Sequence, residues 1–216
     1  MINGSVGSLE VNGSEVGVSA GGWGGALRVR KQLANVFGPA FANDDRNTII
    51  SNGRSIDITD ISDKDSGYIL QKYSNAKSAG GFGSDQTFVD TDFPLFRLAD
   101  VYLMYAEAHL RGGGGSLTTA VGYINALRTR AKNTNTIGSG ELTLDLILDE
   151  RARELHWEAH RRQDLIRFGK FTGGNYNWAW KGNGSNGIAL PAYFKLYPIP
   201  TASMAANPNL TQNPGY

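Results

Sequence analysis

Two histidines lie four residues apart in the second half of the chain, with a glutamate between them: His156, Glu158 and His160. Positions i and i+4 of a helix share one face, so two imidazoles at this spacing could bind a metal ion. In the helix of a zinc hydrolase, however, the glutamate directly follows the first histidine. Here Glu158 lies two residues after His156, about 200° round a helix. The spacing therefore argues against a metal site, and we expect no cofactor.

Charged side chains surround the two histidines. Glu150, Glu154 and Glu158 recur every four residues. The expected partners lie three or four positions away: Glu150 with Arg153, Glu158 with Arg161 or Arg162, and Arg161 with Asp164. Exposed pairs contribute only ~0.2–0.5 kcal/mol each. So many charged side chains on one helix predict that some of the pairs are buried and tie the helix to neighbouring loops.

Glu150 and Glu154 also raise the question of glycoside hydrolysis, which needs two carboxyl groups about 5–9 Å apart. Nearby arginines favour the ionised form of each group, which opposes a role as general acid. Two side chains on one helix also lie on one side of a ligand rather than flanking it. The sequence favours a structural role for both residues, and a metal-dependent or glycosidic hydrolase is the alternative.

Aromatic residues in glycine-rich loops are the remaining candidates for binding. Sugar rings offer C–H faces for aromatic contact and hydroxyls for amide groups such as that of Asn177. Trp178 and Trp180 point the same way if their segment is extended, and Tyr176 lies beside them. The competing interpretation is a lid over the third helix, because large aromatic side chains are more often buried. Trp23, flanked by glycines, is either an exposed platform or a domain contact.

Composition narrows the class of protein. The 21 basic and 20 acidic residues give a net charge of +1, so nucleic acid is not an expected partner. Cysteine is absent, which excludes disulfides and thiolate chemistry within this chain. No apolar run approaches the roughly 20 residues of a membrane-spanning helix. The start of the sequence, MINGSVGSLEVNG, lacks the pattern of an export signal.

Three helices are expected in the second half. In the first, Asp92 is the expected N-cap and Pro94 lies in the first turn. Its apolar face is expected at Leu95, Leu98, Tyr102, Tyr105 and Ala106. After the glycines at 112–115, Ser116 caps a second helix with an apolar stripe: Ala120, Ile124, Leu127 and Ala131. Two helices joined by a glycine turn predict a hairpin of the tetratricopeptide type. Thr143 caps a third, long helix that carries both histidines and ends at Gly169.

The first part of the chain has fewer helical patterns than the second half. Residues 1–92 form a loop-rich region with a short helix near 26–37 and short strands at 47–50 and 68–73. Residues 93–216 form a helical region followed by an aromatic loop and a tail rich in proline and asparagine. The predicted fold class is all-α, with a helical hairpin, a long helix, extensive irregular loops and few short strands.

Five segments resemble the C-terminal half of the SusD/RagB family of surface glycan-binding lipoproteins. They are FPLFRLADVYLMYAEAHL, YINALRTRA, ILDERARELHWEAHRRQDLIRFGKF, LYPIP and NPNLTQNPGY, in the order that the family has. The resemblance implies that the charged run is a structural signature: Glu150, Arg151, Glu154, Glu158, Arg161, Asp164 and Arg167. Ala159 departs from the glycine often found there.

The resemblance also implies a function. Family members bind oligosaccharides or polysaccharides without catalysing a reaction. They cover a SusC-like TonB-dependent transporter as a lid. They sit on the outer membrane through an N-terminal lipid anchor that is absent from this chain, as is the expected N-terminal half. The family's starch-binding founder makes an α-glucan the expected ligand. The competing interpretation is a half that contacts the transporter and has no sugar site of its own.

Overall fold

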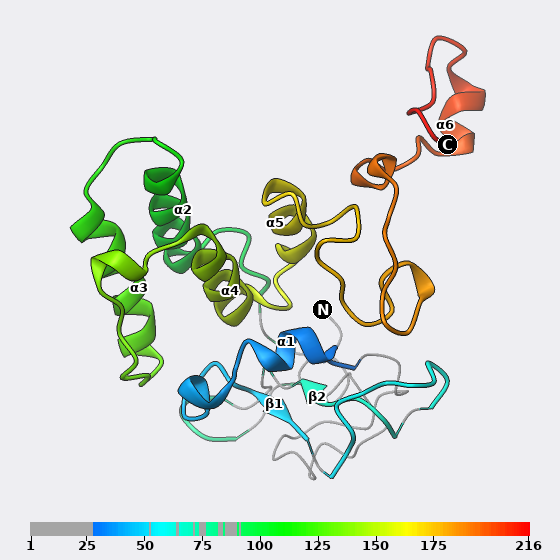
Figure 1. Cartoon of the computed structure of the whole chain (residues 1–216). Helices are drawn as coiled ribbons and strands as arrows, with labels where there is room; N and C mark the ends of the chain where they lie inside the picture. The colour runs from blue at the N-terminus through cyan, green and yellow to red at the C-terminus, as the bar shows by residue number, and fades with distance from the viewer. Residues whose placement is uncertain are drawn as a thin grey trace. The chain divides into compact units, whose positions relative to one another are not determined.

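The computed structural model describes residues 28–51, 53–63, 65–70, 72–73, 77–81, 84, 90 and 92–216. The chain divides into two compact units, Met1–Arg161 and Arg162–Tyr216. Regular structure in the described ranges is mostly helical, with one two-stranded sheet, as the sequence predicted (Figure 1). None of the helices in these ranges has the length and apolar character to cross a bilayer.

The described part of the first unit starts with short elements. Helix α1 (Lys31–Asn35) is followed by a 3-10 turn over Pro39–Phe41. Strand β1 (Ile49–Ile50) pairs antiparallel with β2 (Ile69–Leu70), with Ile49 opposite Leu70. Both expected strands are therefore present but shorter. The expected helix over 26–37 is also shorter, and residues 26 and 27 lie outside the described ranges.

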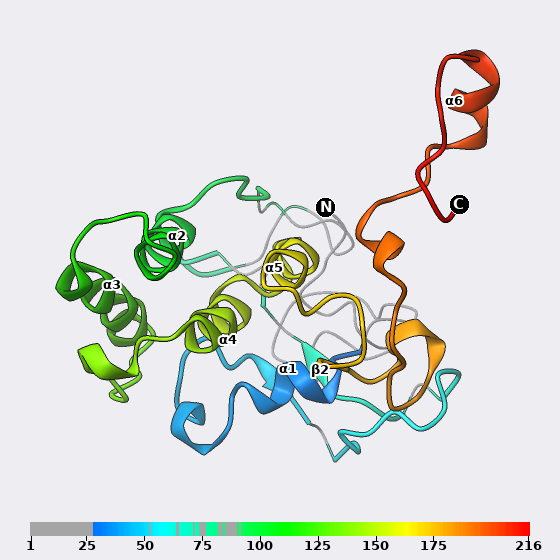
Figure 2. The same cartoon turned by 45° about the horizontal axis from the view of Figure 1, so that its top comes forward.

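Three longer helices complete the first unit. Helix α2 (Leu98–Leu110) packs against both α3 (Leu117–Arg130) and α4 (Leu144–Leu155), as Figures 1 and 2 show. The N-caps of α3 and α4 are the predicted ones. The hydroxyl of Ser116 accepts from the Thr119 amide at 3.3 Å, and that of Thr143 accepts from the Leu146 amide at 3.1 Å. The predicted stripe of α3 is buried throughout: Ala120, Ile124, Leu127 and Ala131.

The start of α2 was predicted wrongly. The chain from Asp92 to Arg97 is not helical, so Asp92 is not the N-cap and Pro94 is not in the first turn. Arg97 is the N-cap residue, with an extended backbone and no capping side chain. Its guanidinium binds Glu154 and Glu158, so ion pairing fixes this boundary.

The buried face of α2 also differs from the expected one. Ala106 is buried as predicted, but Leu95 and Leu98 are exposed, and the chain buries Ala99 and Leu103 instead. Helix α2 is apolar on more than one side, so its pattern allows two buried faces. The observed face carries the small side chains that permit close helix packing.

The third helix was predicted as one piece, and this is also wrong. Helix α4 ends at Leu155, and α5 (Arg161–Arg167) begins after a turn. Trp157 and Ala159 adopt left-handed backbone angles, with φ of 62° and 64°. A left-handed residue cannot continue a right-handed helix. His156 and His160 therefore do not share a helix face.

The second unit contains most of α5, two 3-10 turns (Lys181–Asn183 and Ala192–Lys195) and helix α6 (Thr201–Ala206). The tail folds back on the LYPIP segment. The Gln212 side chain bonds both the amide and the carbonyl of Ile199, at 2.8 and 2.9 Å. Asn213 donates to the Tyr197 carbonyl, and the Tyr216 hydroxyl donates to the Leu196 carbonyl.

Candidate functional site

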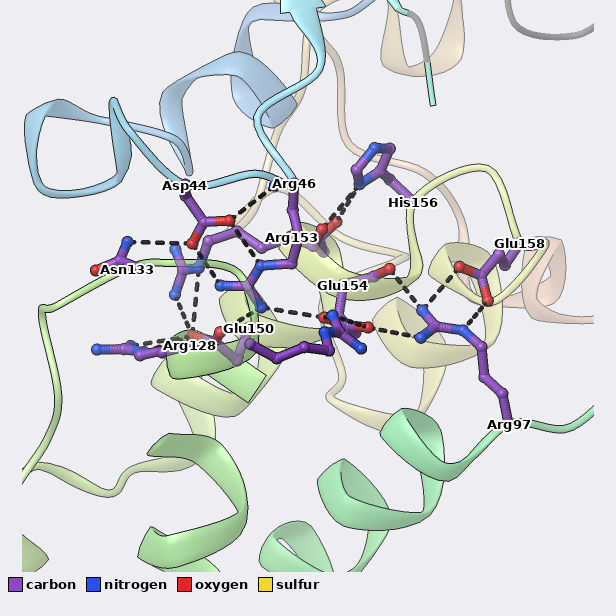
Figure 3. Close-up of polar contacts among 12 residues, drawn as sticks. Asp44, Arg46, Arg97, Arg128, Asn133, Glu150, Arg153, Glu154, His156 and Glu158 are labelled. Carbon is purple, nitrogen blue, oxygen red and sulfur yellow. Dashed lines mark hydrogen bonds and ion pairs between the residues drawn. The ribbon is translucent and has the colours of Figure 1, made fainter. Parts of the chain in front are cut away.

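Carboxylates on α4 and on the turn after it form ion pairs with basic side chains from several distant segments (Figure 3). We call this set the α4 ionic network; its members are Asp44, Arg46, Lys72, Arg97, Arg128, Arg130, Glu150, Arg153, Glu154 and Glu158.

Glu150 lies at the centre of the network and is fully buried. Its Oε1 accepts from Arg46 at 2.8 Å, and its Oε2 accepts from Arg128 and Arg153, each at 3.0 Å. The guanidinium groups of Arg128 and Arg153 also lie over the Phe41 ring, 5.1 and 3.8 Å from its centre. Three guanidinium groups therefore share one carboxylate, and two of them also lie over one aromatic ring.

Glu154 and Glu158 extend the network towards the other helices. Arg97 binds both carboxylates, each at 2.6 Å. Arg130, at the end of α3, donates to Glu154 at 2.7 Å. Lys72, shortly after β2, donates to Glu158 and to the Glu154 carbonyl. These contacts tie the start of α2, the end of α3 and the segment after β2 to α4.

The carboxyl groups of the network are held in the ionised form. Burial by itself would raise the pKa of Glu154, but hydrogen bonds from Arg130 and Arg97 outweigh it and lower the pKa to about 2. Burial would likewise raise the pKa of Glu150, and the charges of Arg153 and Arg46 lower it. A general acid needs a raised pKa. The arrangement suits a structural role rather than glycoside hydrolysis.

The two histidines that suggested a metal have separate surroundings. The Nδ1 of His156 lies 3.1 Å from the Ala152 carbonyl and 3.0 Å from that of Arg153, so Nδ1 carries the hydrogen. Its buried Nε2 has no hydrogen-bond partner within the described residues. Burial, and then the charge of Lys72, lower the pKa of His156 to about 4. No three histidine, aspartate or glutamate side chains gather as metal ligands in the described ranges.

The remaining charged residues of the predicted signature are placed as follows. Arg151 pairs with Asp100 of α2 at 2.8 Å. Asp164 accepts from Arg167 at 2.9 Å. Arg161 donates to the Leu148 carbonyl at 2.9 Å. The expected pair of Glu150 with Arg153 is present, but Glu158 is bound by Lys72 and Arg97, which lie far from it in the sequence.

The aromatic candidates lie in a loop of the second unit that is closed at its base. An antiparallel bridge joins Gly173 to Leu190, and we call residues 173–190 the aromatic loop. Tyr176 and Trp178 are half-buried, with ring centres 6.3 Å apart, and the Phe171 ring stacks on Trp178 at 5.9 Å.

The segment from Tyr176 to Trp180 is not extended, so the argument that Trp178 and Trp180 point the same way does not apply. The backbone of Trp180 is in the left-handed region, with a φ of 64°, and a 3-10 turn follows it. The Lys181 amide donates to the Trp178 carbonyl at 3.0 Å. Gly187, with a φ of 77°, passes so close that a Cβ there would lie 2.5 Å from the Trp178 carbonyl oxygen. Trp178 and Trp180 therefore lie in a tight turn.

Lys181 organises this loop, and no pattern in the sequence predicted this role. Its side chain is buried, and its Nζ donates to the carbonyls of Gly173 and Tyr176, both at 2.7 Å. The ammonium also lies 4.9 Å from the centre of the Trp178 ring. Burial lowers the pKa of Lys181. Asn177 is exposed beside this centre, Trp180 is half-buried, and Trp23 lies outside the described residues.

Comparison with known protein families shows which family this chain resembles. The model of the SusD family matches residues 22–216. The chain is 42% identical to the starch-binding protein SusD of Bacteroides thetaiotaomicron over 179 residues, which are 81% of this chain and 31% of SusD. It is 38% identical to the SusD-like protein P25 of Formosa agariphila over 126 residues, covering 55% of this chain and 23% of P25.

Solved structures of related proteins are also similar to this chain. A SusD superfamily protein from Bacteroides vulgatus matches with a TM-score of 0.61 and 27% identity, over 88% of this chain and 39% of that protein. The surface glycan-binding protein A of Bacteroides thetaiotaomicron matches with a TM-score of 0.52 and 28% identity, over 69% of this chain and 31% of that protein.

The chain belongs to the SusD family. It spans about a third of the length of SusD itself. The proteins of this family are non-catalytic glycan-binding proteins, so the hydrolase alternatives find no support.

Proposed function

We propose that this chain is part of a surface protein that binds oligosaccharides and delivers them to a SusC-like TonB-dependent transporter in the outer membrane. Membership of the SusD family over residues 22–216 is the observation that carries the proposal. In this proposal the protein is held to the membrane by an N-terminal lipid anchor, as the family resemblance implies.

The aromatic loop is the proposed sugar-contacting element in this chain. Tyr176, Trp178 and Trp180 keep part of their surface open, and Asn177 is exposed among them. Aromatic faces would stack on the C–H faces of a sugar, while the amide would meet its hydroxyls. Lys181 holds the loop in shape before ligand arrives, which limits the entropy lost on binding. Trp23 belongs to the same proposal from sequence alone.

The ligand class within this proposal is an α-glucan. The support is the 42% identity to a protein named for starch binding. Malto-oligosaccharides are therefore the first ligands to test, and β-linked oligosaccharides of the same length are the comparison.

Calorimetric titration of these oligosaccharides tests the proposal. Trp178→Ala and Trp180→Ala should each weaken malto-oligosaccharide binding about tenfold, a change of ~1.4 kcal/mol. Phe96→Ala is the matched control, because Phe96 is an exposed aromatic residue outside the loop. Equal affinity in all four proteins would rule out the loop, and released sugars during incubation would contradict a non-catalytic function.

A transporter-contacting half without a sugar site is the second candidate. It is favoured by one observation, that the chain spans only 31% of SusD. The same titration separates the two, since binding by full-length SusD with none by this chain would place the sugar site elsewhere.

A further inference from the structure

The aromatic loop carries two asparagine–glycine pairs, Asn183–Gly184 and Asn186–Gly187, and both asparagines are exposed. In such a pair the backbone nitrogen of the glycine can attack the asparagine side-chain amide, because glycine has no Cβ to shield that nitrogen. The other three pairs of the chain have their asparagine outside the described residues. The two pairs of the loop can therefore be compared with each other.

The nitrogen of Gly187 is held firmly. It donates to the Gly184 carbonyl at 2.8 Å, a normal hydrogen-bond length. Gly187 has a φ of 77°, and a Cβ there would lie 2.5 Å from the Trp178 carbonyl oxygen and 3.1 Å from Asn177 Cβ. Attack on the Asn186 side chain requires the Gly187 nitrogen to leave its hydrogen bond and the backbone to rotate. The closely packed chain around Gly187 opposes that rotation.

The nitrogen of Gly184 is held less firmly. It donates to the Lys181 carbonyl at 3.3 Å, which is longer than the usual N–H···O range of about 2.7–3.2 Å. The nearest atom that a Cβ at Gly184 would meet belongs to the Ile188 side chain, which is 51% exposed. An exposed side chain moves aside more easily than a backbone carbonyl. Gly184 therefore needs a smaller local opening than Gly187 to reach the preceding side chain.

We propose that Asn183 deamidates spontaneously in the folded protein, whereas the loop protects Asn186. The nitrogen of Gly184 attacks Cγ of Asn183; a bond forms between these two atoms, and the bond from Cγ to Nδ2 breaks. Nδ2 leaves as ammonia with the proton that Gly184 loses. Water then opens the resulting succinimide at either of its carbonyl groups, which leaves aspartate or isoaspartate at position 183. This reaction does not depend on the sugar site.

Deamidation at Asn183 changes the charge of the second unit. Its side chains include five basic residues and one acidic residue, Asp164. The new carboxylate is two residues after Lys181, whose ammonium holds the loop together. Isoaspartate also lengthens the backbone of the turn. The deamidated chain therefore has an aromatic loop of altered charge and backbone.

Peptide mapping tests the proposal. The folded 216-residue chain is incubated at mildly alkaline pH in water enriched in heavy oxygen, which labels only residues that react before digestion. Fragmentation of the tryptic peptide 182–195 assigns the label, because this peptide contains both asparagines. Asn183 should react at least about tenfold faster than Asn186. The same chain unfolded in urea is the control and should show similar rates at both positions.

Two results would overturn the proposal. One is a smaller difference between Asn183 and Asn186 in the folded chain, or the reverse order. The other is a difference of the same size in urea, because the local sequence rather than the folded loop would then be its cause.

Lys181→Met provides a second measurement. The substitution removes the donor to the Gly173 and Tyr176 carbonyls and so loosens the loop. Deamidation of Asn186 should become several-fold faster, since Gly187 is then held less firmly. Lys195→Met, at an exposed lysine of the same unit, should leave the rate at Asn186 unchanged. Undiminished protection of Asn186 in Lys181→Met would contradict the loop as the cause of that protection.

Discussion

The α4 ionic network and the aromatic loop both bury charged side chains, but they satisfy them with different partners. In the network, carboxylates meet guanidinium groups from distant segments; Arg46 and Glu150 are 104 residues apart. In the loop, the ammonium of Lys181 meets backbone carbonyls, and the farther of the two belongs to Gly173, eight residues away. The network therefore determines how elements of the first unit are held together, whereas Lys181 determines the shape of one loop.

The largest expected effect comes from Glu150→Gln. The substitution leaves the buried guanidinium groups of Arg46, Arg128 and Arg153 without their shared carboxylate. Breaking a buried ion pair from one side costs about 3–5 kcal/mol of unfolding free energy. Urea unfolding followed by circular dichroism measures the change.

Asp45→Asn is the matched control for this variant. Asp45 pairs with Lys132 at 2.9 Å, and both side chains are largely exposed. Exposed pairs contribute ~0–1 kcal/mol, so this variant should stay close to the parent protein. A similar loss in both variants would show that the burial of the network does not matter.

Acid should lower the stability of the folded chain in two pH ranges, one set by His156 and one by the carboxyl groups of the network. The pKa of His156 is about 4 in the folded protein and 6.5 in the unfolded chain, so stability is complete above pH 6.5 and falls as pH drops towards 4. The pKa of Glu154 is about 2 when folded and 4.5 when unfolded, so its contribution is present above pH 4.5 and is lost towards pH 2. His156 and Glu154 each contribute roughly 3 kcal/mol to this loss.

Two variants assign these steps. His156→Asn keeps a donor near the Ala152 and Arg153 carbonyls but does not titrate, so the decline between pH 6.5 and 4 should disappear. Glu154→Gln should reduce the decline between pH 4.5 and 2 without abolishing it, because the pKa values of Asp44, Glu150 and Glu158 are also lowered. Unfolding free energies measured across this pH range provide the test, and a His156→Asn profile that matches the parent would exclude the histidine as the cause.

Lys181→Met should affect the aromatic loop and leave the first unit unchanged. Methionine keeps much of the apolar stem but leaves the carbonyls of Gly173 and Tyr176 without their donor, at a cost of about 1–3 kcal/mol. Hydrogen exchange of residues 173–190 should become faster, while α2–α4 exchange at the parent rate. Lys195→Met, at an exposed lysine of the same unit, is the control. Faster exchange throughout the chain would contradict a local function for Lys181.

Local sequence signals predicted the elements that local contacts determine. The caps at Ser116 and Thr143 and the stripe of α3 were predicted correctly, because each depends on residues within one or two turns. The burial of charged pairs also followed from their density on the third helix. The partners of Glu158 did not, since Lys72 and Arg97 lie 86 and 61 residues away.

The break in the third helix and the centre of the aromatic loop were missed for a related reason. No glycine or proline separates Leu155 from Arg161, and the charged residues keep a helical spacing through the turn. Lys181 stands in a loop rich in glycine and asparagine, where a lysine is expected to be solvated. In both places, contacts with the surrounding structure outweigh the local pattern.

Ala159→Gly offers a smaller effect of opposite sign, at the turn that places Glu158 in the network. Ala159 has a φ of 64°, and the left-handed region costs a residue with a Cβ about 1–2 kcal/mol relative to glycine. Glycine also raises the entropy of the unfolded chain, which reduces the expected gain in stability to about 0.5–1 kcal/mol. Ala126→Gly, in the middle of α3, should instead destabilise by roughly 0.5–1 kcal/mol. Thermal unfolding of the two variants compares them directly.

If the ion pairs of Glu158 with Lys72 and Arg97 hold the turn in its present shape, alanine-to-glycine substitution must raise stability at position 159 and lower it at position 126. Destabilisation by both would mean that the turn is not held in the left-handed form.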